Sequence, residues 1–104
     1  MMSSDSSRTI PVDTHVQAFP RQISSEAGDE EVVLHLDTGQ YHGLEGVGAF
    51  VWRLVREGAT VGELESAIRR EYEVEPERCR DDLQTLLAEL HERKLVEFHN
   101  EPPR

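Results

Sequence analysis

The sequence predicts an α+β domain in which a three-stranded antiparallel sheet is followed by three helices. Short apolar runs around a Gly-containing turn lie between residues 15 and 44, and three apolar stripes at helical spacing follow up to residue 94. With 104 residues, the chain has the size of one domain. We place this domain at residues 14–98, between a disordered tail of residues 1–13 and a flexible tail of residues 99–104.

The first two strands are predicted from two apolar runs that are separated by a polar segment. Residues 15–19 alternate loosely and stop at a proline, and the polar segment 20–31 after them is assigned to a loop. Residues 32–36 are rich in β-branched side chains, which favour a strand.

The third strand is the return arm of a hairpin. A two-residue turn at Thr38 and Gly39 leads into residues 40–44, which contain Gly43. Edge strands are usually protected by charge or proline, and this strand carries neither. We therefore expect it to form an open edge of the sheet.

The helices have clear start and stop signals. The first begins near Val47 and ends at Gly58, a capping box of Thr60 and Glu63 opens the second, and Pro76 opens the third. The apolar stripe of the third helix consists of Cys79, Leu83, Leu86, Leu87 and Leu90.

The last apolar stretch, residues 95–98, alternates and fits a final short strand or wing. Two short helices, a longer helix and this tail resemble a winged helix-turn-helix. A fold of this kind does not by itself assign a function.

The charge balance is strongly acidic, with 21 Asp and Glu residues against 11 Lys and Arg, a formal net charge of -10. Such a chain repels nucleic-acid phosphates and anionic membranes. The third helix carries four cations against five carboxylates, so it makes a poor DNA-recognition helix. A winged-helix DNA-binding regulator is the alternative hypothesis. Without a visible secretory signal or an apolar run of about 20 residues, we expect a cytoplasmic protein.

No motif for catalysis stands out. The sequence contains no phosphate-binding Gly-rich loop and no motif that would activate a nucleophile, and its one cysteine, Cys79, falls on an apolar stripe. The two-residue turn would place His35 opposite His42, with Asp37 as the nearest third ligand. Metal binding at these residues is kept only as an alternative. We expect no enzyme activity, no cofactor and no metal.

A resemblance to a known family rests on an ordered set of motifs. Residues 36–52, LDTGQYHGLEGVGAFVW, resemble the PqqD-like family, in which a strand-turn-strand of the form L-D-x-x-[ST]-G-x-Y-x-x-L-N precedes a Gly-x-x-[IV]-W helix. The later matches are Thr60-Val61-Gly62-Glu63-Leu64, Tyr72-Glu73-Val74-Glu75-Pro76, and the leucines of the last helix. The resemblance covers residues 32–96. Glu45 departs from it, since the family commonly has Asn there, a better N-cap.

The resemblance implies a RiPP recognition element, a winged-helix-like domain without catalytic activity. Such a domain binds the leader segment of a ribosomally made precursor peptide and presents it to a modifying enzyme, such as a leader protease or a radical-SAM enzyme. Free-standing members serve pyrroloquinoline quinone, lasso-peptide and related pathways. We expect a monomer or weak dimer that binds neither nucleic acid nor membranes.

The resemblance also implies where the leader binds. The leader is expected to add as a strand to residues 40–44 and to lie against the last helix. The implied peptide-binding residues are Gln40, Tyr41, His42, Gly43, Leu44, Arg80, Leu83, Gln84, Leu87 and His91.

Overall fold

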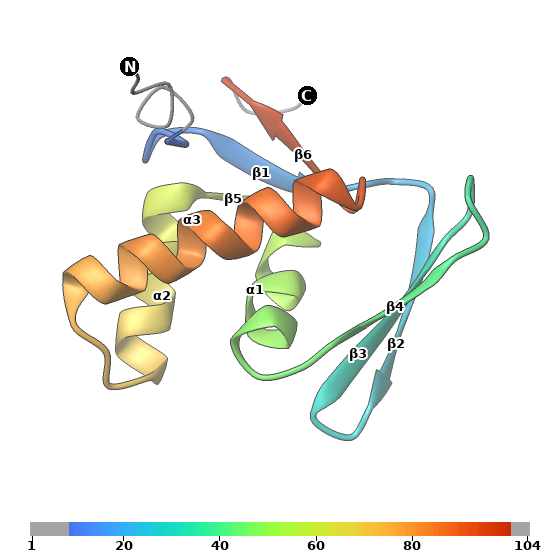
Figure 1. Cartoon of the computed structure of the whole chain (residues 1–104), viewed down its shortest axis with the longest axis horizontal. Helices are drawn as coiled ribbons and strands as arrows, with labels where there is room; N and C mark the ends of the chain where they lie inside the picture. Colours follow the sequence, from blue (N-terminus) through green and yellow to red (C-terminus); the bar gives the residue numbers. More distant parts are fainter. Residues whose placement is uncertain (1–8, 101–104) are drawn as a thin grey trace, which may run out of the picture.

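The computed structural model describes residues 9–100, which form two small antiparallel sheets and three helices (Figure 1). The strands are β1 (His15–Ala18), β2 (Gln22–Ala27), β3 (Glu30–His35), β4 (Tyr41–Leu44), β5 (Ala59–Thr60) and β6 (Val96–His99). The helices are α1 (Val47–Val55), α2 (Val61–Glu71) and α3 (Pro76–Glu92). The α+β class is therefore confirmed.

One sheet has the order β2-β3-β4 and contains a strand that the sequence analysis missed. The predicted loop over residues 20–31 is wrong, because β2 pairs with β3 from Gln22↔His35 to Ala27↔Glu30. Gly28 and Asp29 connect the two strands, and Gly28 has the positive φ of 69° that tight hairpin turns require. The segment looked like a loop because its side chains are mostly polar.

The other sheet has the order β5-β1-β6. The first predicted strand is confirmed as β1, but it pairs with β5 and β6 and not with the strands of the β2-β3-β4 sheet. The wing predicted at residues 95–98 is β6. The single predicted sheet is thus two sheets, and β4 still lies at the edge of one of them, since its pairing is with β3.

The helices follow their predicted signals. The Thr60 hydroxyl accepts a hydrogen bond from the Glu63 backbone N–H at 3.1 Å, and the Glu63 carboxylate accepts one from the Thr60 N–H at 2.8 Å. Pro76 occupies the first turn of α3. The cap of α1 is Gly46, with φ 58°, and not Glu45, so this helix begins without a side-chain cap.

The core lies between the three helices and the inner faces of both sheets. Figure 1 shows α3 as a long rod across the molecule, with α1 and α2 packed beneath it and the β2-β3-β4 sheet beyond its C-terminal end. Trp52 of α1 is fully buried, and its indole N–H donates to the Ser24 hydroxyl of β2 at 3.0 Å. This bond connects the β2-β3-β4 sheet to the helices.

The folded region begins earlier than predicted. Ile10 packs against the core, and its backbone N–H and carbonyl bond the side-chain amide of Gln84 at 2.7 and 2.9 Å. Residues 9–13 therefore belong to the domain and not to a tail. The rest of the predicted N-terminal tail and residues 101–104 lie outside the described residues.

Candidate functional site

The open edge of β4 exposes a defined set of backbone groups. In an antiparallel ladder, hydrogen-bonded pairs alternate with pairs whose N–H and C=O point away from each other. His35 donates its backbone N–H to the Gln40 carbonyl at 2.9 Å, and the register pairs Val33 with His42. His42 and Leu44 therefore bond β3, while the N–H and C=O groups of Tyr41 and Gly43 face the open edge.

The turn before β4 is longer than the predicted two residues. The His35 Nδ1 atom accepts backbone N–H bonds from Asp37 and Thr38 at 3.2 and 3.3 Å, and Gly39 takes a φ of 74°. His42 consequently lies opposite Val33 and not opposite His35. Both imidazoles face the interior side of the sheet.

One flank of α3 lies next to β4, and Gly48 at the start of α1 links the two. A methyl group placed on Gly48 would lie 3.8 Å from Leu86 Cδ1 and 4.0 Å from Leu44 Cβ. Farther along the helix, Arg93 lies close enough to His42 for its charge to affect that imidazole. The flank beside β4 thus runs through Leu86 to Arg93.

A small apolar pocket of about 250 Å³ opens on this flank. It is lined by Val47, Gly48, Ile68, Tyr72, Val74, Cys79, Asp82, Leu83 and Leu86. Val47 and Tyr72 are each 36% exposed, which is unusual for apolar side chains beside a core. The pocket therefore offers an apolar side chain a place next to the end of β4.

Most of the predicted α3 residues lie on the other flank. Gln84 and His91 each stand two positions before a residue of the β4 flank, which is a rotation of about 200° around the helix. Gln84 binds Ile10, His91 stacks on Phe98 at 4.6 Å, and Arg80 pairs with Glu65 at 3.4 Å.

The two predicted leucines of α3 differ in position. Leu87 is fully buried in the core, whereas Leu83, although only 2% exposed, lines the apolar pocket. Of the α3 residues predicted for the site, the structure therefore brings Leu83 next to it. Arg93 was not among the predicted site residues, and Leu86 was predicted only as a core residue.

The predicted residues of the strand lie together on β4 or next to it. Tyr41 is 71% exposed, and Gln40 directly precedes the strand. Burial lowers the pKa of the His42 imidazole below its ordinary value of 6.5, and the nearby Arg93 and His35 lower it further. His42 is therefore neutral near pH 7.

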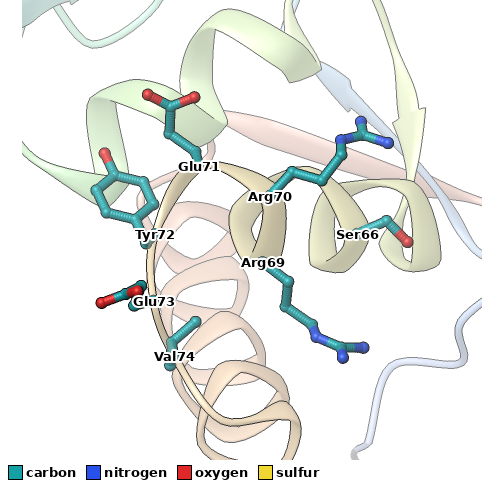
Figure 2. A pocket seen from close by; sticks show the side chains of 7 residues that line it. All are labelled: Ser66, Arg69, Arg70, Glu71, Tyr72, Glu73 and Val74. Carbon is teal, nitrogen blue, oxygen red and sulfur yellow. The ribbon is translucent and has the colours of Figure 1, made fainter.

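The described residues were predicted to offer few groups for metal or thiol chemistry, and two observations bear on this. Within residues 9–100, no group of three or more His, Cys, Asp or Glu side chains could hold a metal ion. Burial raises the pKa of the Cys79 thiol, and the charge of Glu65 adds to this effect, so the thiol stays protonated. An open hollow of about 460 Å³ lies at the end of α2, but Figure 2 shows Arg69 and Arg70 pointing away from Tyr72. Its side chains do not converge on a ligand.

None of the helices in the described part of the chain is both long enough and apolar enough to span a membrane.

Comparisons with known proteins agree with the fold. A chain titled "TbiB1 in Complex with the TbiA(beta) Leader Peptide" matches with a TM-score of 0.74 and 37% identity, over 78% of this chain and 94% of that one. A second, "Lasso peptide synthetase B1 complexed with the leader peptide", matches in fold with a TM-score of 0.70 and 21% identity, over 79% and 96% of the two chains.

No curated protein matches the sequence. Residues 30–96, more than half of the chain, match the model described as "Coenzyme PQQ synthesis protein D (PqqD)". The chain therefore belongs to the PqqD family.

Proposed function

We propose that this protein is a non-catalytic adaptor that binds the leader segment of a ribosomally made precursor peptide at the open edge of β4. The outward N–H and C=O groups of Tyr41 and Gly43, next to the apolar pocket at Leu86, carry this proposal. An extended peptide would pair with these groups and continue the β2-β3-β4 sheet. Both structural neighbours are titled as complexes with leader peptides, which supports the same role.

The binding energy requires both parts of this site. Tyr41 and Gly43 together offer four backbone groups, and each new hydrogen bond contributes about 1 kcal/mol net. Micromolar affinity corresponds to about 8 kcal/mol. Backbone pairing alone therefore falls short, and apolar burial in the pocket supplies the remainder.

The proposed contacts differ from the predicted set on α3. The strand residues Gln40, Tyr41, His42, Gly43 and Leu44 are kept, together with Leu83. On the helix, Leu86 and Arg93 of the β4 flank replace Arg80, Gln84, Leu87 and His91.

The adaptor would deliver its peptide to a second protein that carries the chemistry, such as a leader protease or a radical-SAM enzyme. The described residues support a role in binding, because their single thiol is buried and their pockets are open or apolar. DNA binding has no comparable support, since the exposed surface of α3 includes Glu77, Asp81, Asp82, Glu89 and Glu92.

A titration tests the proposal. A fluorescent leader, taken from the precursor encoded beside this chain, should bind saturably with a Kd below about 100 μM, or about 5.5 kcal/mol. In an NMR titration, the backbone amides of Tyr41 and Gly43 should become protected from solvent exchange. Absence of saturable binding, or binding that leaves both amides unprotected, contradicts the proposal.

A further inference from the structure

Two buried imidazole nitrogens, on β4 and at the end of β3, have no hydrogen-bond partner among the described residues. The Nε2 atom of His42 is buried and makes no hydrogen bond among the residues that the structure describes. The Nε2 atom of His35, whose side chain is only 2% exposed, has no described partner either. An unmade hydrogen bond at a buried polar group is costly, so a ligand that supplies an acceptor gains binding energy there.

The protonation of His35 follows from its contacts. Its Nδ1 atom already accepts two backbone N–H bonds, from Asp37 and Thr38. Because Nδ1 accepts these bonds, the ring proton is on Nε2, and this atom is a donor. The His35 Nε2 atom thus needs an acceptor and not another donor, and the neutral His42 imidazole can present its own Nε2–H to an acceptor as well.

Arg93 adds a positive charge to this cluster. Phe19 connects this part of the chain to the histidines, since its ring stacks on His35 at 4.6 Å and its backbone N–H donates to the Leu95 carbonyl at 2.8 Å. The charge of Arg93 lowers the pKa of His42, which agrees with this position. Across residues 9–100, no ion pair uses Arg93. The Arg93 charge therefore makes this end of the site locally positive in a chain with a net charge of -10.

We propose that His42 and Arg93 recognise a carboxylate side chain, an aspartate or glutamate of the bound leader. This inference rests on the proposed function, because it requires a peptide strand beside β4. The backbone carbonyls of that strand are engaged with Tyr41 and Gly43, so the acceptor has to come from a side chain. Guanidinium and imidazole N–H groups bind carboxylates through charge-assisted hydrogen bonds.

The register also predicts where this carboxylate stands in the leader. An antiparallel peptide that bonds Tyr41 and Gly43 places one residue directly opposite His42, with its side chain on the same face of the sheet. The residue opposite Leu44 comes two positions earlier in that peptide and lies beside the apolar pocket. The expected leader motif is therefore an apolar residue, any residue, and then aspartate or glutamate.

A coupled titration tests this inference. The leader encoded beside this chain is made with each Asp changed to Asn, or each Glu to Gln, and is titrated against the wild-type protein and Arg93→Gln. Arg93→Gln should weaken wild-type leader binding about five- to tenfold. One amide variant should lose as much with the wild-type protein and nothing further with Arg93→Gln. Arg56→Gln, which removes the same charge at the far end of α1, should bind normally.

The outcomes separate this inference from the proposed function. If the leader binds the wild-type protein but Arg93→Gln binds within twofold of it, or if no acidic position couples to Arg93, the carboxylate site is refuted and leader binding stands. If the wild-type protein does not bind the leader, the proposed function fails first and this inference fails with it. A coupled acidic residue two positions after an apolar one would support the register as well.

Discussion

Replacing Gly43 with proline should weaken leader binding without disrupting the hairpin. The Gly43 N–H faces the open edge, so proline removes a donor that β3 does not use. Proline is tolerated on edge strands where the N–H faces solvent. Leu44→Pro would be a poorer choice, because the Leu44 N–H faces β3 and its loss would weaken the sheet itself.

The size of the effect follows from the number of bonds at this edge. Proline removes one of four possible backbone bonds, about 1 kcal/mol. Its ring also occupies the space that the carbonyl of the peptide would approach, so neighbouring bonds are lost as well. We expect a loss of about 1.4 to 2.8 kcal/mol, which is tenfold to a hundredfold in Kd.

Gly43→Ala is the matched control. A Cβ atom at Gly43 would meet nothing within 4 Å, so alanine should fold and bind as the wild type does. Fluorescence anisotropy with the labelled leader gives both Kd values, and thermal unfolding checks that both variants are folded. If folded Gly43→Pro binds within twofold of Gly43→Ala, the leader does not pair with the edge of β4.

Three further predictions concern the pocket, the buried ion pair and the histidine. Leu86→Ala should weaken leader binding about fivefold with little loss of stability, because half-buried Leu86 lines the pocket; unchanged affinity would exclude the pocket from the site. Arg53→Met should lower the free energy of unfolding in urea by about 2 kcal/mol, since Arg53 pairs at 2.9 Å with the fully buried Glu31 carboxylate, whereas Arg56→Met should change it little. Because burial lowers the pKa of His42 in the folded state, its contribution to stability is present above about pH 6.5 and is lost as the pH falls through the folded pKa. Urea titrations of His42→Gln should show a weaker pH dependence over this window, and an identical dependence would contradict the assignment.

The helices could be predicted because their signals are local. Capping boxes, N-terminal prolines and C-terminal glycines act within one turn, and the Thr60–Glu63 box forms as its spacing indicates. The hairpin register could not be predicted in the same way. The side chain of His35 supplies the hydrogen bonds of the turn, and nothing in the pattern of polar and apolar residues reports that contact.

Strand β2 was missed for a related reason. Its sequence, QISSEA, is polar, and its place in the sheet depends on pairing with β3 and on the bond between Ser24 and Trp52, 28 positions apart. β propensity describes how well side chains fit a half-buried pleated surface, and that surface does not exist until the partners assemble. The Gly28-Asp29 turn between the two strands was the local signal that could have indicated this hairpin.

The α3 residues predicted for the site differ from those beside β4 because a helical stripe does not report its neighbours. The apolar stripe identifies the buried face, and Leu87 and Leu90 are indeed buried. Which flank of α3 lies next to β4 depends on the direction in which α1 starts after the hairpin. That direction brings Gly48 of α1 close to Leu86 of α3. An offset of two residues in the sequence then moves a side chain by about 200° around the helix.

The same cluster that would select a carboxylate also disfavours pairing between two copies of the chain. An antiparallel pair of β4 edges bonded through Tyr41 and Gly43 would place His42 opposite its symmetry mate and bring two Arg93 side chains to one face. It would gain the same backbone bonds as a peptide but add no acceptor for the buried imidazoles and no anion for the guanidinium groups. The two chains would also each carry a net charge of -10. A leader with an apolar residue and a carboxylate at the right spacing meets both needs, so an edge that is open to strands in general is selective for one kind of strand.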